Sequence, residues 1–576
     1  MSEFVPRTLS IIRRTLAGEP RGWPGRVHPV LRRVYAARGV LCPQDAETRL
    51  CGLLPPGAVH GIDTALELLI DALARQARIM VAADFDCDGA CGAAIALRGL
   101  RMLGAQSVGY VVPNRMVHGY GLSPALMETL QPVPDLIVTV DNGIAAHAGV
   151  TAAKAGGCTV IVTDHHLPGA TLPDADAIVN PQLGADALPK NLCGAAVIFY
   201  LLLALRAKLR EQGEFGSAPE PDLSSLLDLV ALATVADLVP LDRNNRILVQ
   251  SGLRRIRSDR ACAGIAALIE VAGCDPRKID AADLGYAIGP RINAAGRLQD
   301  MTLGIECLLT DDPPRARELA AILHGINGER RGLQDAMVAD AETMLARVDV
   351  NTCGVTLFDP AWHQGVIGLV ASKIKERLHR PVIAFALADQ GDAKSLRGSA
   401  RSIPGFHIRD ALAEIDAREP GLIQRFGGHA MAAGLSLRTA NYGRFTQCFD
   451  AIARERIAPD LLQPLLHSDG ELDCADFDLE LARQLKSAGP WGQGFPPPLF
   501  DNVFECTGRR RIGAEQRHLR INLRDRRDGR VHTGMRFNAD TDPPHASAVR
   551  VAYELAVDDW QGVETLRLIL RHIEPA

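Results

Sequence analysis

An apolar run that ends abruptly in closely spaced carboxylates sets the strongest limit on how this chain folds. Ile79–Ala83 is entirely apolar, and Asp84, Asp86 and Asp88 follow it at every second position. A short apolar run predicts a buried parallel strand, and the small residues of 90–103 predict a helix after it. The carboxylates would then lie at the edge where open α/β sheets bind their ligands. Taken alone, the same residues are also compatible with an acidic turn that caps the helix.

Two more strand-like runs end in polar side chains. Leu136–Val140 precedes an aspartate, and Cys158–Thr163 precedes an aspartate and two histidines. A fourth contribution comes from the apolar helical run that ends at Asp237. Since the carboxyl ends of parallel strands share one edge of a sheet, this repetition favours a ligand site over separate helix caps or solvated turns. The side chains concerned are Asp84, Asp86, Asp88, Asp141, Asp164, His165, His166 and Asp237.

The predicted side chains suit a divalent metal ion. Asp and His ligands together favour Mn²⁺ or Mg²⁺ over zinc, which prefers sulfur and nitrogen. The carboxylates also exceed the number that a single ion needs. Two ions that share a bridging carboxylate activate water and stabilise in-line displacement at phosphorus. We therefore expect two divalent metal ions, Mn²⁺ or Mg²⁺, and the hydrolysis of a phosphate ester. Cys87, which lies within the first cluster, is expected to be a spacer that points away from the metals.

The overall charge of the chain does not decide whether it binds nucleic acid. Its 576 residues include 63 basic and 68 acidic ones, for a formal net charge of −5, so a polyanion would have to contact a local basic patch. The clearest patch lies between Arg509 and Arg536, where ten arginines stand against three acidic residues. On alternating strands these arginines would follow a phosphate backbone, although an ordinary solvated face has the same composition. Candidate stacking aromatics are Phe537, Tyr553 and Trp560.

Cysteine usage and hydropathy point to a reducing, aqueous compartment. The thirteen cysteines contain no Cys-x-x-Cys pair, so we expect neither a disulfide framework nor a zinc knuckle. The N-terminus lacks the sustained apolar segment of a secretory signal. The most apolar segment, 193–205, is shorter than the roughly 20 residues that span a bilayer. This segment is expected to be a buried helix, and the protein is expected to be cytoplasmic, with no membrane partner.

The order of strand-like and helical runs predicts several domains. We expect an N-terminal arm over 1–50, rich in Arg, Pro and Gly, and a parallel-sheet α/β catalytic domain over 51–312, where the two kinds of run alternate. One long helix, 313–348, would join it to a smaller α/β domain at 349–457. Alternating runs in 458–576 predict a small OB-like β-barrel or a sandwich that binds nucleic acid.

The ordered set of motifs resembles a known family. In chain order, the four polar clusters are similar to the motifs of the DHH phosphoesterase superfamily, and three later motifs are similar to the DHHA1 domain that accompanies it. With the C-terminal β-domain, the resemblance covers nearly the whole chain after residue 50 and is greatest to the single-strand-specific 5′→3′ DNA exonucleases of this superfamily. The motifs are Asp84-x-Asp86-x-Asp88-Gly89, Asp141-Asn-Gly143, Asp164-His165-His166, Ala233-Thr-Val-Ala-Asp237, Trp362-His-Gln-Gly-Val-Ile-Gly368, Gly398-Ser-x-Arg401 and Gly427-Gly-His-x-x-Ala-Ala-Gly434.

The resemblance implies a role for each residue of the polar edge. His166 would orient His165 or contact the phosphate, since metal ligands are usually hydrogen-bonded by a second layer of residues. Asp164 would be structural. The catalytic set would be Asp88, Asp141, His165, His166 and Asp237; one ion would be held by Asp88, Asp141, His165 and Asp237, and the other would be held or supported by Asp84 and Asp86, with Asp141 as the bridge.

The resemblance also implies a pocket for the end of the nucleic acid. Phosphate pockets are built from arginine forks, hydroxyls and exposed amides. Ser399 and Arg401 would bind the terminal phosphate, and Arg115 would reach it from the first domain unless it is a surface loop residue. His429 would contact a phosphate or cap a helix. The remaining candidates, which would contact the strand near the scissile phosphate or form ion pairs at a domain interface, are Arg291 and Arg297.

Together these features predict a single-stranded-DNA-specific 5′→3′ exonuclease that releases 5′-mononucleotides and acts in DNA repair and recombination. The expected partners are single-stranded DNA, a single-strand-binding protein and a helicase, and the protein is expected to be a monomer. One alternative is a phosphodiesterase for short oligoribonucleotides or cyclic dinucleotides, but such relatives generally lack an arginine-rich β-domain. Another is an inactive DNA-binding replication scaffold, which would have lost motif aspartates that are all present here.

Overall fold

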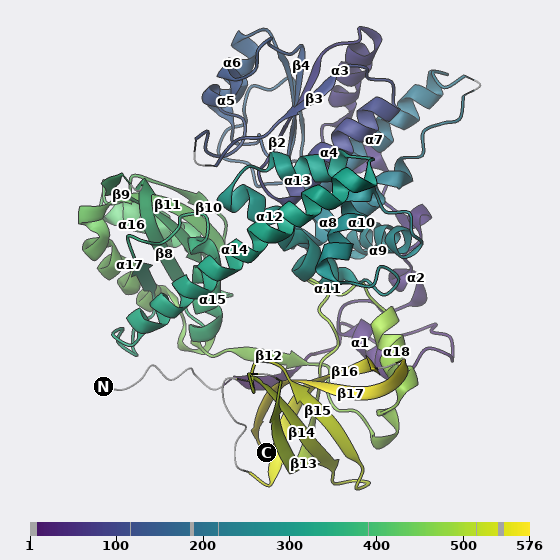
Figure 1. Cartoon of the computed structure of the whole chain (residues 1–576), viewed down its shortest axis with the longest axis vertical. Helices are drawn as coiled ribbons and strands as arrows, with labels where there is room; N and C mark the ends of the chain where they lie inside the picture. Colours follow the sequence, from purple (N-terminus) through teal and green to yellow (C-terminus); the bar gives the residue numbers. More distant parts are fainter. Residues whose placement is uncertain are drawn as a thin grey trace. The chain divides into compact units, whose positions relative to one another are not determined.

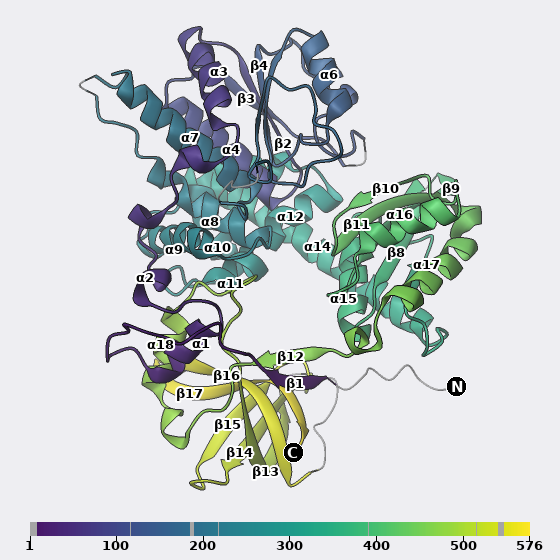
Figure 2. The same cartoon turned by 180° about the vertical axis from the view of Figure 1, so that it is seen from behind.

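The computed structural model describes residues 9–115, 117–184, 189–216, 218–389, 391–513, 515–539, 546–560 and 562–576. Figures 1 and 2 show the chain from two opposite sides. The chain divides into two compact units. The first unit comprises Thr15–Asn327 and Asp469–Ala576, and the second comprises Gly328–Ser468 with the N-terminal segment up to Arg14.

A five-stranded parallel sheet forms the centre of the first unit, with the strand order β3-β2-β4-β5-β6. Alternate side chains of β4 enter different cores: Leu136 and Val138 pack on one side of the sheet and Ile137 on the other. Burial of both faces explains why these strands read as continuous apolar runs. The strands are β2 (Ile79–Ala83), β3 (Val108–Val111), β4 (Leu136–Val140), β5 (Thr159–Thr163) and β6 (Ala177–Val179).

Three packed helices, α4 (Cys87–Met102), α7 (Gly194–Glu211) and α8 (Leu227–Ala236), support one side of this sheet. Small residues let α4 approach its neighbours closely. An ideal Cβ on Gly92 would lie 2.4 Å from Cγ1 of Val140. The other helices of the unit are α1 (Pro29–Ala36), α2 (Pro43–Ala46), α3 (Ile62–Ala74), α5 (Pro124–Glu128), α6 (His147–Ala155), α9 (Arg243–Arg257), α10 (Ala263–Ala272), α11 (Ala281–Asp283), α12 (Gly289–Leu298), α13 (Thr302–Leu309) and α18 (Leu479–Ser487).

Part of the segment expected to form an arm is built into the core of the first unit. In α1, Val34 is fully buried and the ring of Tyr35 packs 6.1 Å from that of Trp491. Beyond α1, the guanidinium of Arg38 donates to both carboxylate oxygens of Asp469, at 2.7 and 3.0 Å, and both side chains are buried. The Arg, Pro and Gly content of this segment predicted an irregular arm, but the segment includes a short amphipathic helix, α1.

A closed five-stranded barrel completes the first unit, with the order β13-β14-β15-β17-β16. Residues of β14 alternate between buried and exposed, which places apolar side chains inside and arginines outside. The predicted β-barrel is therefore present. Its strands are β13 (Phe500–Ile512), β14 (His518–Asp525), β15 (Val531–Arg536), β16 (Ala548–Trp560) and β17 (Val563–Pro575).

A mixed sheet forms the second unit, in the order β10-β11-β9-β8-β7, with only β7 and β8 parallel. Phe385 of β8 and Phe445 and Phe449 of α17 fill its core. The elements are β7 (Val355–Phe358), β8 (Val382–Asp389), β9 (Asp392–Arg401), β10 (Arg425–Gly428), β11 (Ala432–Arg438), α15 (Ile367–Leu378), α16 (Ile408–Arg418) and α17 (Tyr442–Arg456), with β1 (Ser10–Arg13) parallel to β12 (Leu465–Ser468).

The long helix expected from the sequence is present. α14 (Pro313–Leu345) has 33 residues and passes from the first unit into the second. Within the described ranges, no helix combines the length and the apolar character needed to cross a membrane.

Replacing Arg38 with Met is expected to lower the free energy of unfolding by about 3–5 kcal/mol, because Asp469 would keep a buried charge without its guanidinium partner. Urea unfolding of the purified protein measures the change. The matched control is Arg75→Met, since both side chains of the Arg75–Asp71 pair are more than half exposed, and it should change stability little. Equal losses in the two variants would contradict the expectation.

Candidate metal centre

The first cluster of carboxylates occupies the turn from β2 into α4. Asp84 follows the last residue of β2, Asp86 caps α4 by accepting from the amide of Gly89 at 3.0 Å, and Asp88 lies in the first helical turn. The turn is too tight for a side chain at position 89, because an ideal Cβ on Gly89 would lie 2.4 Å from the Asp84 carbonyl oxygen. The helix begins at Cys87, earlier than expected, and so includes Asp88.

Asp141 follows β4 in an unusual backbone conformation. Its φ of +62° lies in the left-handed region, which costs a residue with a side chain about 1–2 kcal/mol. The neighbouring Asn142 supports the turn: its Oδ1 accepts from the amide of Leu122 at 3.1 Å, and its Nδ2 donates to the carbonyl of Ala82 at 2.9 Å. Backbone strain that is held in place by a hydrogen-bond network is typical of functional positions.

The three residues after β5 form one hydrogen-bonded turn. The carboxylate of Asp164 accepts from the amides of His165 and His166 at 2.7 and 3.1 Å and from that of Ile144 at 2.9 Å. It also lies 2.8 Å from Nδ1 of His166. Burial alone would lower the pKa of His166, but the hydrogen bond and the charge of Asp164 raise this pKa above its ordinary value.

Asp237 reaches the site from the C-terminal end of α8, where it is the C-cap. A carboxylate is unfavourable at this position, because the helix macrodipole is negative at the C-terminus. The placement is stabilised only if a positive charge lies nearby.

The predicted ligands converge on one place. Nε2 of His165 lies 3.0 Å from a carboxylate oxygen of Asp141, 3.6 Å from one of Asp237 and 4.0 Å from one of Asp88. Three groups of candidate ligands together include every predicted metal ligand, and Asp141 and His165 each belong to two of them. The groups, whose ligand atoms lie within 4.8 Å of one another, are Asp88, His165 and Asp237; Asp84, Asp86 and Asp141; and Asp141, His165 and His166.

The cluster holds more negative charge than the protein offsets. Burial and the charge of Asp86 raise the pKa of Asp84 well above its ordinary value and that of Asp88 to about 6. Burial and the charge of Asp88 likewise raise the pKa values of Asp141 and Asp237. One buried oxygen each of Asp84 and Asp141 has no hydrogen-bond donor within the described part of the chain. Oxygen and imidazole ligands with this unmet charge fit Mn²⁺ or Mg²⁺.

Two side chains outside the predicted set contact the metal centre. Oδ1 of Asn293 accepts from the amide of Cys87 at 2.9 Å, which fixes the start of α4. The hydroxyl of Tyr120 donates to the carbonyl of Asp141 at 3.1 Å, and its ring meets that of Phe85 edge-on. Both residues lie in glycine-rich stretches, but only the fold brings them to the carboxylates.

Three arginines of the first unit were expected to contact substrate. The guanidinium of Arg115 lies 4.1 Å from the ring centre of Phe85. Because Phe85 stands between Asp84 and Asp86 in the sequence, Arg115 is beside the metal centre. Arg291 is buried, and its Nε donates to Nδ1 of His324 at 3.3 Å. Arg297 is half-buried near the C-terminal end of α12. Contact of these arginines with substrate stays a prediction.

The second unit holds the residues expected to bind the terminal phosphate. Ser399 and Arg401 lie two residues apart on β9, and Nη1 of Arg401 donates to Oγ of Ser399 at 3.0 Å. The first turn of α15 approaches them closely, since an ideal Cβ on Gly368 would lie 2.8 Å from Nη2 of Arg401. His429 is exposed between β10 and β11, a hairpin in which Gly434 pairs with Ser399. The fold thus brings Ser399 and Arg401 together and places His429 on the adjoining hairpin.

The basic patch lies on the barrel, but part of its charge is already paired. Two of its arginines, Arg510 and Arg520, face each other across β13 and β14. The prediction that Tyr553 stacks on nucleic acid is wrong, because the ring is fully buried and its hydroxyl donates to Asn502 at 2.7 Å. Phe537 is half exposed, and the side chain of Trp560 lies outside the described residues. The arginines that form ion pairs with acidic side chains are Arg517, Arg524, Arg527 and Arg530.

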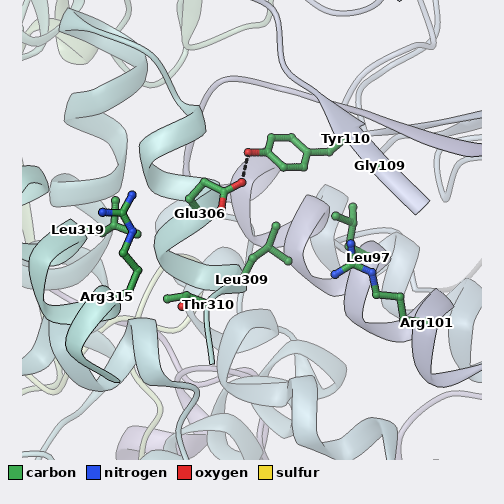
Figure 3. A pocket seen from close by; sticks show the side chains of 9 residues that line it. All are labelled: Leu97, Arg101, Gly109, Tyr110, Glu306, Leu309, Thr310, Arg315 and Leu319. Atoms are coloured by element: carbon green, nitrogen blue, oxygen red, sulfur yellow. Dashed lines mark hydrogen bonds between the residues drawn. The ribbon is translucent and has the colours of Figure 1, made fainter. Parts of the chain in front are cut away.

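A pocket of about 430 Å³ also lies in the first unit, where the hydroxyl of Tyr110 donates to Glu306 (Figure 3). It is separate from the metal centre. Leu97 on its wall follows Asp88 by nine residues of α4, a distance of about 13 Å along a helix axis. The pocket is lined by Leu97, Arg101, Gly109, Tyr110, Glu306, Leu309, Thr310, Arg315 and Leu319, none of which was expected in the site.

Comparison with known families matches three successive regions of the chain. A model of the DHH family N-terminal domain matches residues 78–234, one of the DHHA1 domain matches 349–455, and one of the RecJ OB domain matches 468–572. The single-stranded-DNA-specific exonuclease RecJ of Salmonella typhimurium is 47% identical, over 98% of this chain and 99% of the relative. The chain belongs to the RecJ family. RecJ of Escherichia coli is 46% identical, over 98% of this chain and 99% of the relative.

Solved structures agree with this RecJ assignment. The crystal structure of RecJ from Thermus thermophilus in complex with Mn²⁺ has a TM-score of 0.80 at 33% identity, covering 96% of this chain and 76% of that chain. The corresponding Mg²⁺ complex has a TM-score of 0.76 at 31% identity, with 96% and 75% covered. The expected architecture of DHH, DHHA1 and OB domains is therefore confirmed. Divalent metal complexes are also known for two RecJ structures that share this fold.

Replacing Asp164 with Asn in this RecJ-family protein is expected to lower the pKa of His166, because the variant removes the negative charge that stabilises the imidazolium. The NMR titration of the histidine ring protons in metal-free protein measures the shift. His363 serves as the internal control. Burial lowers its pKa and no carboxylate shifts it, so it should titrate unchanged. An unaltered His166 pKa in the variant would contradict the assigned hydrogen bond.

Proposed function

We propose that this protein is a metal-dependent 5′→3′ exonuclease that hydrolyses single-stranded DNA to 5′-mononucleotides in DNA repair and recombination. The observation that carries the proposal is the convergence of five aspartates and His165 at one edge of the parallel sheet. The substrate is supported by relatives named single-stranded-DNA-specific exonuclease, which match 98% of the chain. A replication scaffold without activity would not need to retain the complete set of carboxylates.

We infer that two ions share the cluster. Asp88, His165 and Asp237 would hold one and Asp84 with Asp86 the other, with Asp141 as the bridge, because Asp141 groups with Asp84 and Asp86 and one of its carboxylate oxygens also lies 3.0 Å from Nε2 of His165. When bound, such ions lower the pKa of water and stabilise negative charge at phosphorus.

His166 has a separate role in this proposal. Because its Nδ1 is engaged by Asp164, the imidazolium would present Nε2 to a phosphate oxygen. The hydrogen bond and the charge of Asp164 raise the pKa of His166, which favours the protonated ring. The residue would therefore stabilise charge on the phosphate without serving as a metal ligand.

The direction of digestion would follow from the second unit. We propose that Ser399 and Arg401 bind the 5′-terminal phosphate, since a hydroxyl and a guanidinium 3.0 Å apart offer several donors to one anion. His429 would add a further donor.

The barrel would hold the rest of the strand. Arg510 and Arg520 lie directly opposite each other, and like charges in that arrangement are destabilising unless an anion lies between or above them. A phosphate backbone supplies such anions, and its binding would weaken as salt concentration rises.

Alanine at Asp88 or Asp237 is expected to reduce exonuclease activity by at least about 100-fold, since metal-ion catalysis contributes several kcal/mol to the barrier. Single-turnover digestion of a labelled strand measures the loss, and circular dichroism checks folding. Asp311→Asn is the matched control, because the Asp311 side chain is 83% exposed and its partner in an ion pair is Arg98, which is not a predicted ligand. Near-normal turnover in either alanine variant would refute the metal assignment.

A substrate panel tests specificity and direction. With Mn²⁺, the protein is expected to degrade a single-stranded DNA from its 5′ end and to leave a duplex and an RNA of the same sequence largely intact. Arg401→Ala should slow a 5′-phosphorylated strand by about 10-fold or more, the loss of a charge-assisted hydrogen bond of about 1.5–3 kcal/mol, with little effect on a 5′-hydroxyl strand. Release of nucleotides from the 3′ end would contradict the proposed pocket, and preferential digestion of RNA would favour the oligoribonucleotide alternative.

A further inference from the structure

The first turn of α7 contacts the metal centre, although the mechanism above assigns it no role. The amide of Gly194 donates to Oδ2 of Asp88 at 2.6 Å, and the amide of Ala195 donates to Oδ1 at 2.9 Å. Both oxygens of one proposed ligand are thus held by consecutive backbone groups.

Gly194 also sets the position of a second carboxylate. An ideal Cβ at this residue would lie 2.4 Å from Cβ, 2.7 Å from Cα and 2.8 Å from Cγ of Asp141. Distances this short are not tolerated between carbon atoms, so any side chain would displace either α7 or Asp141. The requirement for glycine is one of space, because Gly194 is not among the residues with positive φ.

The positive N-terminal end of the α7 dipole also stabilises the carboxylates of the metal centre. The N-terminus of an α-helix carries roughly half a positive charge, and α7 directs it at the carboxylate cluster. The helix spans 18 residues and is buried over most of its length, so this charge is little screened by solvent. It partly offsets the repulsion between Asp88 and Asp141 before any metal ion is bound.

We propose that Gly194 is a positioning residue of the metal centre. Its amide, together with that of Ala195, fixes the orientation of Asp88, and its lack of a side chain lets Asp141 lie close to the start of α7, where it would serve as a ligand. The inference rests on the proposed function in that it takes Asp88 and Asp141 to be metal ligands. Gly194 would act through Asp88 and Asp141 and not by binding metal or substrate itself.

Gly194→Ala is expected to weaken Mn²⁺ binding by about 10–100-fold, the effect typical of groups that orient metal ligands. Binding is measured on the full-length protein, first stripped of metal with a chelator, from the EPR signal of free Mn²⁺. As a second readout, the Mn²⁺ concentration for half-maximal exonuclease activity should rise by a similar factor, while the rate at saturating Mn²⁺ recovers most of the wild-type value. A merely structural defect would lower the rate without this shift.

Gly264→Ala provides the matched control. An ideal Cβ on Gly264 would lie 2.0 Å from the carbonyl oxygen of Cys307, so the substitution creates a comparable backbone clash between α10 and α13 in the same unit. This variant should lose thermal stability but bind Mn²⁺ like the wild type. If Gly194→Ala does not fold, Ala195→Pro in the first turn of α7 replaces one of the two donors with a ring carbon that would turn Oδ1 of Asp88 away, and it should weaken Mn²⁺ binding in the same way.

The outcomes separate this proposal from the proposed function. Wild-type Mn²⁺ affinity in a folded Gly194→Ala or Ala195→Pro variant would overturn the positioning role. An equal loss of affinity in Gly264→Ala would also overturn it, because the loss would then follow general destabilisation. If the wild-type protein itself bound no Mn²⁺, the proposed metal-dependent function would be contradicted, whatever the variants showed.

Discussion

The mutual repulsion of buried carboxylates is the constraint on which the rest of this protein depends. Five aspartates converge at the edge of one sheet, and the burial of Asp84, Asp88 and Asp141 makes their charged forms costly. The surrounding structure meets this cost locally and only in part: amides of α7 face Asp88, and Asp164 holds the imidazole of His166. The charge that remains is the reason that the site fits divalent cations.

Much of the site could be predicted from the sequence because its ligands lie next to strong local signals. Asp84, Asp141 and Asp164 each directly follow a strand that its β-branched residues make easy to predict. The carboxyl ends of parallel strands must share one edge of the sheet. What the sequence could not supply is contact between distant segments. Gly194 lies 106 residues from Asp88, and a glycine inside an apolar helical run carries no visible sign of the carboxylates it touches.

The errors of prediction have equally physical causes. Tyr553 was expected to stack on nucleic acid because it is aromatic and lies in a basic region, but strand alternation turns it into the barrel core. The sequences of β9 and β10 are hard to recognise as strands, because glycine, serine and charged residues obscure a period of two. A count of arginines likewise overstates available charge, since Arg527 is held by the buried Asp525 at 2.6 Å.

Two independent conditions limit the residues that position 141 can accept: its left-handed backbone and its proposed role as a ligand. Asparagine, aspartate and glycine tolerate such a conformation best, whereas the bridging ligand proposed for this position must be a carboxylate. Aspartate alone satisfies both conditions, and glutamate, though chemically equivalent as a ligand, meets only one. The backbone conformation therefore restricts which side chains are accepted at position 141. It would continue to favour aspartate or asparagine even in a descendant that no longer bound metal.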